Sequence, residues 1–267
     1  MKSKITGGGT EFIFTLRLMN KYDVRYYRCL DTGFIQTEDP YWLQEAYSSA
    51  ITKLDVGMVM RNEQLREQAQ NFIMRFLNQN GIFLDFAGGY GLFTRMMRDR
   101  GFNFFHHDQY CQNIFAEYFE LADAGQADGF ELVTAFEVFE HMEKPMEEIR
   151  NITTFSDHLL FTTHLQPQRS LTDWWYLAPE TGQHIAFHTY KSLEYLATEL
   201  GYNFYSNGVS IHLFCKNRLA SNPFQKEEDP ALIKIMRRKI ARYDSKKVNK
   251  ATLLERDFNY IKNRLRS

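Results

Sequence analysis

Short apolar runs alternate with helical stretches through the middle of the chain. Four runs have the length of buried strands: 82–86, 103–107, 130–136 and 158–163. Segments with helical spacing lie before and between them, at 63–78 and 145–152 among others. This alternation predicts an α/β fold with a parallel sheet covered by helices on both faces.

The flanking regions follow other patterns. Residues 11–36 favour short strands, and 38–43 resembles the start of a capped helix. After a helix at 191–200, residues 203–205 and 209–215 predict a terminal hairpin. The tail carries two apolar stripes at helical spacing, Leu232, Met236, Ile240, Tyr243 and then Leu254, Phe258, Ile261, Leu265. We therefore expect a cap (1–60) on the substrate side, a core (61–220) and an amphipathic helical tail (221–267).

Composition excludes several classes of protein. The 267 residues are 44% hydrophobic and 24% charged, which is typical of a globular protein and not of a disordered one. The sequence contains no run of roughly 18 apolar residues, and its start lacks the pattern of a signal peptide. Its three cysteines are widely spaced, so we expect reduced thiols in a cytoplasmic protein.

Charge is distributed unevenly. Residues 221–267 contain 13 Lys and Arg against 6 Asp and Glu, whereas 1–220 contain 19 against 27. A basic tail of this kind suits a peripheral contact with an anionic membrane or an acidic protein, although a solvated helical pair without a partner is an open alternative. The acidic body argues against a broad phosphate footprint, so no nucleic acid partner is expected.

A glycine cluster follows the first apolar run. Ala87, Gly88, Gly89 and Gly91 separate this strand from a good helix beginning. A strand, a tight glycine turn and a helix form a binding site for adenosine-containing cofactors, because small residues let the backbone approach the ligand. The nicotinamide pattern GxGxxG fits poorly, since Thr94 stands where the third glycine belongs.

Two carboxylates at strand ends indicate which cofactor the turn binds. Asp85 precedes the turn and would repel a pyrophosphate, so it favours a cofactor with a cationic amino acid, S-adenosylmethionine. Asp108 ends the next strand and is placed to accept the ribose hydroxyls. The alternative is that Asp85 stabilises a helix N-terminus and Asp108 forms a turn.

With these segments the chain resembles the class I S-adenosylmethionine-dependent methyltransferases, in the branch of the ubiquinone-type O-methyltransferases. The resemblance rests on residues 84–91, Asp108, and 134–142 with Pro145. It implies a Rossmann-like, seven-stranded methyltransferase sheet. Ala87, in place of a glycine, departs from the family pattern, as does Glu131 in place of an aspartate. Residues 36–43 are loosely similar to methyltransferases of polysaccharide clusters.

The segment after the third strand is rich in metal-ligating groups. If it forms a helical turn, Glu137, Glu140 and His141 share one face at i, i+3 and i+4. Such a mixed oxygen and nitrogen site suits Mg, Mn, Fe or Zn. By the resemblance His184 completes the set. The alternative is that Glu140 and His141 cap the helix and His184 acts alone as a general base.

Other side chains are candidates for base and acceptor. Without a metal the base would be a histidine, with His184, His164 and His188 as candidates in that order. His106 and His107 are expected to be structural. Aromatic residues suit an acceptor pocket or, equally, the packing of a lid: Tyr41, Trp42, Trp174, Trp175 and Tyr176. Arg169 would meet an anionic substituent of the acceptor.

The sequence thus predicts an O-methyltransferase that uses S-adenosylmethionine and acts on a hydroxyl of a sugar, a glycan or a nucleotide-linked sugar. His184, His141 and Glu137 would be catalytic, and Glu137 would also face the cofactor. Two alternatives remain. One is a small aromatic or natural-product O- or N-methyltransferase, and the other is a non-catalytic S-adenosylmethionine-binding scaffold that docks a glycan-assembly or membrane partner.

Overall fold

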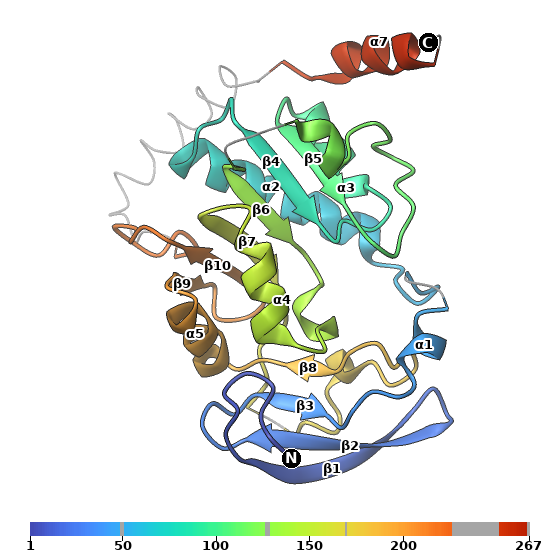
Figure 1. Cartoon of the computed structure of the whole chain (residues 1–267), viewed down its shortest axis with the longest axis vertical. Coiled ribbons are helices and arrows are strands. Elements are labelled where there is room, and N and C mark those ends of the chain that lie inside the picture. Colours follow the sequence, from blue (N-terminus) through green and yellow to red (C-terminus); the bar gives the residue numbers. More distant parts are fainter. Residues whose placement is uncertain (49–50, 126–128, 169, 226–250, 266–267) are drawn as a thin grey trace, which may run out of the picture.

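The computed structural model describes residues 1–48, 51–125, 129–168, 170–225 and 251–265. Its central sheet has the strand order β5-β4-β6-β7-β10-β9 (Figure 1). The first four strands run parallel, and β10 is antiparallel to both of its neighbours. The bounds are β4 Ile82–Phe86, β5 Asn103–His107, β6 Leu132–Ala135, β7 His158–Thr162, β9 Asn203–Ser206 and β10 Ile211–Cys215. The predicted α/β fold with a Rossmann-like sheet is confirmed.

The strand count differs from the prediction. The described residues form six strands in this sheet instead of seven, and beside β5 there is a single parallel bridge between His106 and Glu120. Side chains hold the preceding segment in turns: Asp108 Oδ1 accepts the amides of Tyr110 and Cys111, and Asn113 bonds both backbone groups of Ala116. A strand cannot extend through residues that are held in this way.

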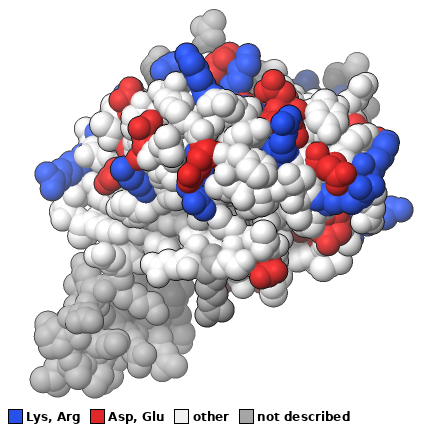
Figure 2. Space-filling model, turned by 90° about the horizontal axis from the view of Figure 1, so that it is seen from below, with Lys and Arg blue, Asp and Glu red and all other residues white. Residues whose placement is uncertain are grey.

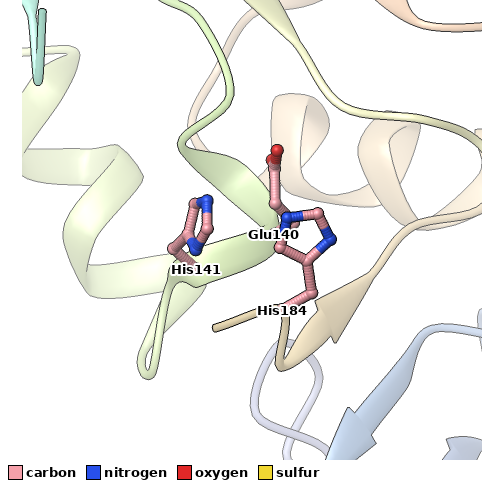
Figure 3. Close-up of side chains that lie close together, drawn as sticks. All are labelled: Glu140, His141 and His184. Atoms are coloured by element: carbon pink, nitrogen blue, oxygen red, sulfur yellow. The ribbon is translucent and has the colours of Figure 1, made fainter. Parts of the chain in front are cut away.

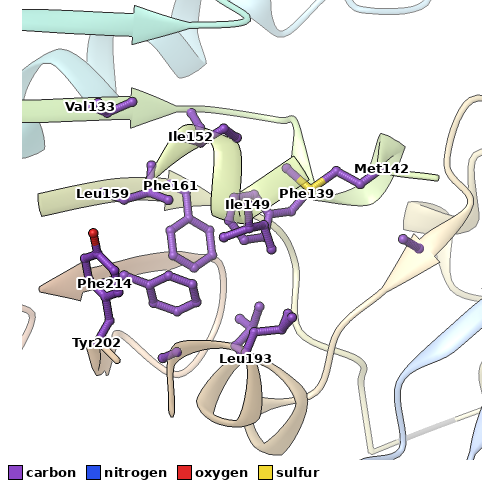
Figure 4. Packing of buried hydrophobic residues seen from close by; sticks show 14 of the residues in the cluster. Val133, Phe139, Met142, Ile149, Ile152, Leu159, Phe161, Leu193, Tyr202 and Phe214 are labelled. Carbon is purple, nitrogen blue, oxygen red and sulfur yellow. The ribbon is translucent and has the colours of Figure 1, made fainter. Parts of the chain in front are cut away.

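Helices cover both faces of this sheet. Helices α2 (Met58–Phe76) and α3 (Leu92–Asp99) pack on one face, where they meet strand residues such as Phe83 and Leu160. Helices α4 (Pro145–Ile152) and α5 (Tyr190–Glu199) pack on the other, where Ile149 and Leu193 meet Val133, Phe161 and Phe214 (Figure 4). Because alternate strand residues point to opposite faces, each strand contributes to both apolar clusters.

The cap is a second sheet with the order β1-β2-β3-β8. It consists of β1 Thr10–Leu18, β2 Tyr22–Cys29, β3 Ile35–Thr37 and β8 Ala186–Phe187, and the short helix α1 (Leu43–Ala46) follows β3. Its last strand, β8, comes from residues 61–220, which the sequence assigned to the core. The cap sheet is therefore built from two separate parts of the chain. Trp42 is 1% exposed and its Nε1 donates to the Gly182 carbonyl at 2.8 Å, which ties the cap to the core.

Both charge signs occur together on the outer face of the cap (Figure 2). Ion pairs link neighbouring strands there, for example Arg17 with Asp23 and Arg28 with Glu11. Mixed charges of this kind do not form the one-signed footprint of a phosphate-binding surface.

The described part of the tail contains α7 (Leu254–Arg264), which lies beside α3 and β5 (Figure 1). Its apolar stripe is largely exposed, with Phe258 62% and Leu265 70% accessible, and buried Asp257 faces the core instead. The first predicted stripe, Leu232 to Tyr243, lies outside the described residues. Within the described ranges, every helix is too short or too polar to cross a bilayer.

Candidate functional site

The turn between β4 and α3 is tight and left-handed. Ala87, Gly89 and Gly91 have φ of 55°, 58° and 81°. A Cβ on Gly91 would stand 2.1 Å from the Asn113 side-chain oxygen, and one on Gly88 would stand 2.4 Å from Asp85 Oδ2. Glycine is therefore required at both positions for close packing. Ala87 adopts the left-handed conformation despite its methyl group.

Two strand-end acids support this turn. Asp85 is 2% exposed and accepts hydrogen bonds from the Thr94 and Thr134 hydroxyls. Burial raises the pKa of Asp85 to about 6, although nearby His106 opposes the shift. Asp108 Oδ2 accepts the Gly89 amide at 2.9 Å, so this carboxylate connects the end of β5 to the glycine turn.

His106, beside the glycine turn, has a hydrogen-bond partner on each ring nitrogen. His106 is buried, and its Nε2 lies 2.9 Å from the Gly89 carbonyl while its Nδ1 lies 3.1 Å from Glu120. These contacts fit the structural role expected from the sequence. They also hold the glycine turn in place, because the His106 imidazole connects the Gly89 carbonyl to Glu120 at the edge of the sheet.

A second group of polar side chains meets beyond β6. Glu140 and His141 lie in the short 3-10 helix η2 (Phe139–His141), and His184 precedes β8. One ligand atom from each of the three lies within 4.8 Å of the others (Figure 3). The structure thus brings together three of the four residues that the sequence proposed for a metal.

The hydrogen bonds of this cluster leave donor atoms available for a cation. His141 Nδ1 lies 3.0 Å from the Gln183 carbonyl and His184 Nδ1 lies 2.6 Å from the Tyr176 carbonyl. A carbonyl only accepts, so each Nδ1 carries the proton and each Nε2 carries the lone pair. Backbone anchoring of this kind is typical of histidines that bind metals.

Glu140 is fully buried. Neither of its carboxylate oxygens has a well-formed hydrogen bond, although a weaker hydrogen-bonding contact with the Tyr176 hydroxyl lowers its pKa. Burial, and then the charge of Glu137, raise the pKa of Glu140 to about 8. Burial lowers the pKa of His141 to about 4 and that of His184 to about 3. With this pKa Glu140 is largely protonated near neutral pH, and a divalent cation between it and the two neutral imidazoles would stabilise its ionised form.

Glu137 lies apart from this cluster. The helical turn expected over residues 137–141 begins only at Phe139, because Glu137 has φ of 57°. Its amide donates to Thr162 Oγ1, and that hydroxyl donates back to its carboxylate at 2.7 Å. Its other oxygen lies 3.7 Å from Arg61 Nε. The sequence did not single out Arg61, whose role depends on contacts far along the chain.

The candidate bases have different surroundings. The His164 ring packs against Trp175 and Tyr176, and burial lowers the pKa of His164. His188 is completely buried between Phe34 and Phe139, so an acceptor has no access to it. The charge of Glu137 acts on both His164 and His184, but only His184 belongs to the cluster with Glu140.

The aromatic candidates divide into exposed and buried residues. Tyr41 and Trp175 are 64% and 69% exposed, whereas buried Trp42 and partly buried Trp174 pack in the apolar cluster of the cap sheet. Arg169 lies outside the described residues. Tyr47, which the sequence did not suggest, stacks on Tyr110 and packs edge-on against His141 at a centroid distance of 6.2 Å. It links the segment that follows β5 to the cluster of Glu140, His141 and His184.

A family model described as a methyltransferase domain matches residues 61–207. Similar solved structures include CalO1, a methyltransferase in calicheamicin biosynthesis with SAH bound (14% identity, TM-score 0.38, 67% of this chain and 60% of that chain). Another is a family 2 O-methyltransferase from Planctomyces limnophilus in complex with apigenin (14%, 0.40, 64% and 63%). Human N-acetylserotonin methyltransferase in complex with SAM is a third (12%, 0.39, 66% and 66%).

The alignments span less than two thirds of the length of these three structures. A search of curated protein sequences gave no significant match.

Proposed function

The chain belongs to the methyltransferase domain family, and on that premise we propose that it transfers a methyl group from S-adenosylmethionine to a hydroxyl oxygen of a sugar, in a glycan or a nucleotide-linked sugar. The observation that carries the choice of an oxygen acceptor is the cluster of Glu140, His141 and His184. A sugar hydroxyl has a high pKa, so its attack on carbon needs a group that removes or stabilises its charge.

The glycine turn fits the cofactor. When bound, S-adenosylmethionine supplies a methyl group on an electrophilic sulfonium. Gly88, Gly89 and Gly91 let the turn pack closely against neighbouring side chains, and Asp108 at the end of β5 would hold the ribose hydroxyls. Asp85 places negative charge beneath the turn, which favours the cationic amino-acid end over a pyrophosphate.

The cluster of Glu140, His141 and His184 would make the acceptor hydroxyl more reactive. Two imidazole nitrogens and one carboxylate oxygen suit Mn, Fe or Zn, and Mg less well. A divalent cation there would stabilise an alkoxide. Glu140 supplies the negative charge for it, and the Gln183 and Tyr176 carbonyls keep both histidines in the tautomer that binds. His164, beside Trp175, is the nearby imidazole that could accept the hydroxyl proton.

A transfer assay with radiolabelled cofactor tests this function. The acceptor panel should contain free sugars, nucleotide sugars, oligosaccharides and catechols, each with and without Mn²⁺. We expect transfer to a sugar hydroxyl that chelation suppresses. Transfer to catechols alone would establish the aromatic alternative, which the exposed Trp175 favours. Cofactor binding without transfer to any acceptor would favour the scaffold, with the basic segment 221–267 as its docking part.

Cofactor affinity is expected to depend on pH through Asp85. Its pKa of about 6 means that the carboxylate is ionised above this pH and neutral below it. S-adenosylmethionine carries a net positive charge and binds the ionised form better, so its affinity should fall by up to about tenfold between pH 7 and pH 5. Calorimetry at several pH values measures this. Asp85→Asn should flatten the profile, and a slope that persists in this variant would assign the titration to another group.

A further inference from the structure

Tyr176 contacts the cluster of Glu140, His141 and His184 with both its backbone and its side chain. It lies in the short 3-10 helix η3 (Trp175–Leu177) and is 1% exposed. Its carbonyl accepts a hydrogen bond from His184 Nδ1 at 2.6 Å, and its hydroxyl makes the weaker contact with the Glu140 carboxylate. One residue therefore reaches two candidate ligands that come from separate segments of the chain, after β6 and before β8.

The Tyr176 ring is held by aromatic neighbours. It packs against the His184 and His164 imidazoles, with centroid distances of 4.7 and 4.8 Å. Trp174 and Phe187 contact the same ring from the apolar cluster of the cap sheet. A buried side chain that is packed in this way keeps one rotamer. The phenol oxygen is therefore held at a fixed position beside the cluster.

The direction of the hydrogen bonds follows from the chemistry of the partners. An ionised carboxylate only accepts, so the Tyr176 hydroxyl has to donate to ionised Glu140. A phenol has a single proton, which leaves its oxygen as an acceptor for a second partner. Thr163 is fully buried and its Oγ1 lies 3.4 Å from this oxygen, so it is placed to donate. The three side chains thus form a short chain in which each hydrogen bond polarises the next.

We propose that Tyr176 is a positioning residue of this cluster: its hydroxyl fixes the Glu140 carboxylate in the orientation that binds a divalent cation. A hydrogen bond to a metal-ligating carboxylate limits the directions in which its oxygens can point, and such bonds are typical of metal sites. The carbonyl of the same residue fixes the tautomer of His184, so Tyr176 orients two of the three ligands. This inference rests on the proposed function, because it concerns the same cation site.

Titration with Co²⁺, followed by its visible absorption, tests the proposal. Tyr176→Phe keeps the ring and the carbonyl and removes only the hydroxyl. It should weaken Co²⁺ binding by about tenfold, the lower end of the range for losing a hydrogen bond to a metal ligand, and change S-adenosylhomocysteine affinity by less than about twofold. Tyr26→Phe is the matched control and should change neither. Tyr26 is a fully buried tyrosine of the same apolar cluster, and its hydroxyl has no hydrogen-bond partner among the described residues.

A second background shows whether Tyr176 acts through Glu140. In Glu140→Gln, which already lacks the carboxylate, adding Tyr176→Phe should change Co²⁺ affinity by less than about twofold, because residues that act as one unit are not additive. An equal loss in both backgrounds would mean that the hydroxyl supports the shape of the site and does not orient Glu140. S-adenosylhomocysteine binding reports whether each variant is folded.

The outcomes separate this inference from the proposed function. If Tyr176→Phe binds Co²⁺ as tightly as the wild type, or if the wild type binds no Co²⁺, the positioning role is wrong, while methyl transfer by the wild type still supports the proposed function. If the wild type binds Co²⁺ but transfers a methyl group to no acceptor, the proposed function fails, and the Co²⁺ affinities of the variants still decide the role of Tyr176.

Discussion

Replacing Glu140 with glutamine is expected to lower kcat for methyl transfer by at least about 100-fold and to change S-adenosylhomocysteine affinity by less than about threefold. Glutamine keeps the size of the side chain and removes its charge. The glycine turn and Asp108 lie at the ends of β4 and β5, away from this carboxylate, so the cofactor should bind normally. Labelled-methyl transfer measures kcat, and calorimetry measures the affinity.

The same variant should bind divalent metal more weakly. Titration with Mn²⁺ is expected to show one site in the wild type and at least about tenfold weaker binding in Glu140→Gln, with the same result for His184→Ala. Glu147→Gln provides the matched control, since Glu147 is a solvent-exposed residue of α4. Full activity in both Glu140→Gln and His184→Ala would exclude this cluster from catalysis.

Local signals in the sequence were sufficient for the central strands. The runs 82–86 and 103–107 are the observed bounds of β4 and β5, because each apolar run ends at a polar or glycine-rich turn. The glycine turn was predictable for the same reason: its conformation depends on neighbours in the chain. Asp85 and Asp108 then follow from the rule that ligands bind at the carboxyl ends of parallel strands.

Distant contacts explain what could not be predicted. The left-handed conformation of Glu137 depends on Thr162, 25 residues away on β7. The pairing of β3 with β8 joins segments about 150 residues apart, and neither short strand shows a clear alternation by itself. Spacing grouped Glu137, Glu140 and His141 on the wrong assumption of a continuous helical turn, and the resemblance added His184, which the structure places beside Glu140 and His141.

The tail is the clearest case of a misleading local pattern. The stripe through Leu254, Phe258, Ile261 and Leu265 favours these residues as the buried face of α7, yet Ile261 alone of the four packs against the core and the other three are exposed. The buried polar contact of the helix is an ion pair between residues 159 positions apart: Arg98 Nε and Nη2 donate to the two carboxylate oxygens of Asp257, both at 2.8 Å. The partner of a single charged residue cannot be read from hydropathy.

Replacing Asp257 with alanine is expected to lower the free energy of unfolding by about 3 kcal/mol and to release α7 from the core. Arg98 is 1% exposed, its guanidinium lies 3.6 Å from the centre of the Phe119 ring, and burial lowers its pKa while Asp257 opposes that shift. Without Asp257 this buried cation loses its balancing charge, which typically costs 3–5 kcal/mol. Hydration of Arg98 after the helix leaves would keep the loss near the lower value. Urea unfolding measures the free energy, and limited proteolysis detects the released helix.

A double variant separates the cost of an unpaired charge from the value of the pair. Arg98→Met with Asp257→Leu removes both charges, so we expect it to recover most of the stability that Asp257→Ala loses, because apolar side chains of similar size can replace a buried ion pair. Glu255→Ala, in the first turn of the same helix, controls for changes in helix propensity and should alter stability by less than about 0.5 kcal/mol. If Asp257→Ala is as stable as the wild type, the ion pair does not hold α7 on the core. If the double variant is no more stable than Asp257→Ala, the loss comes from the missing contacts of the pair and not from an uncompensated Arg98.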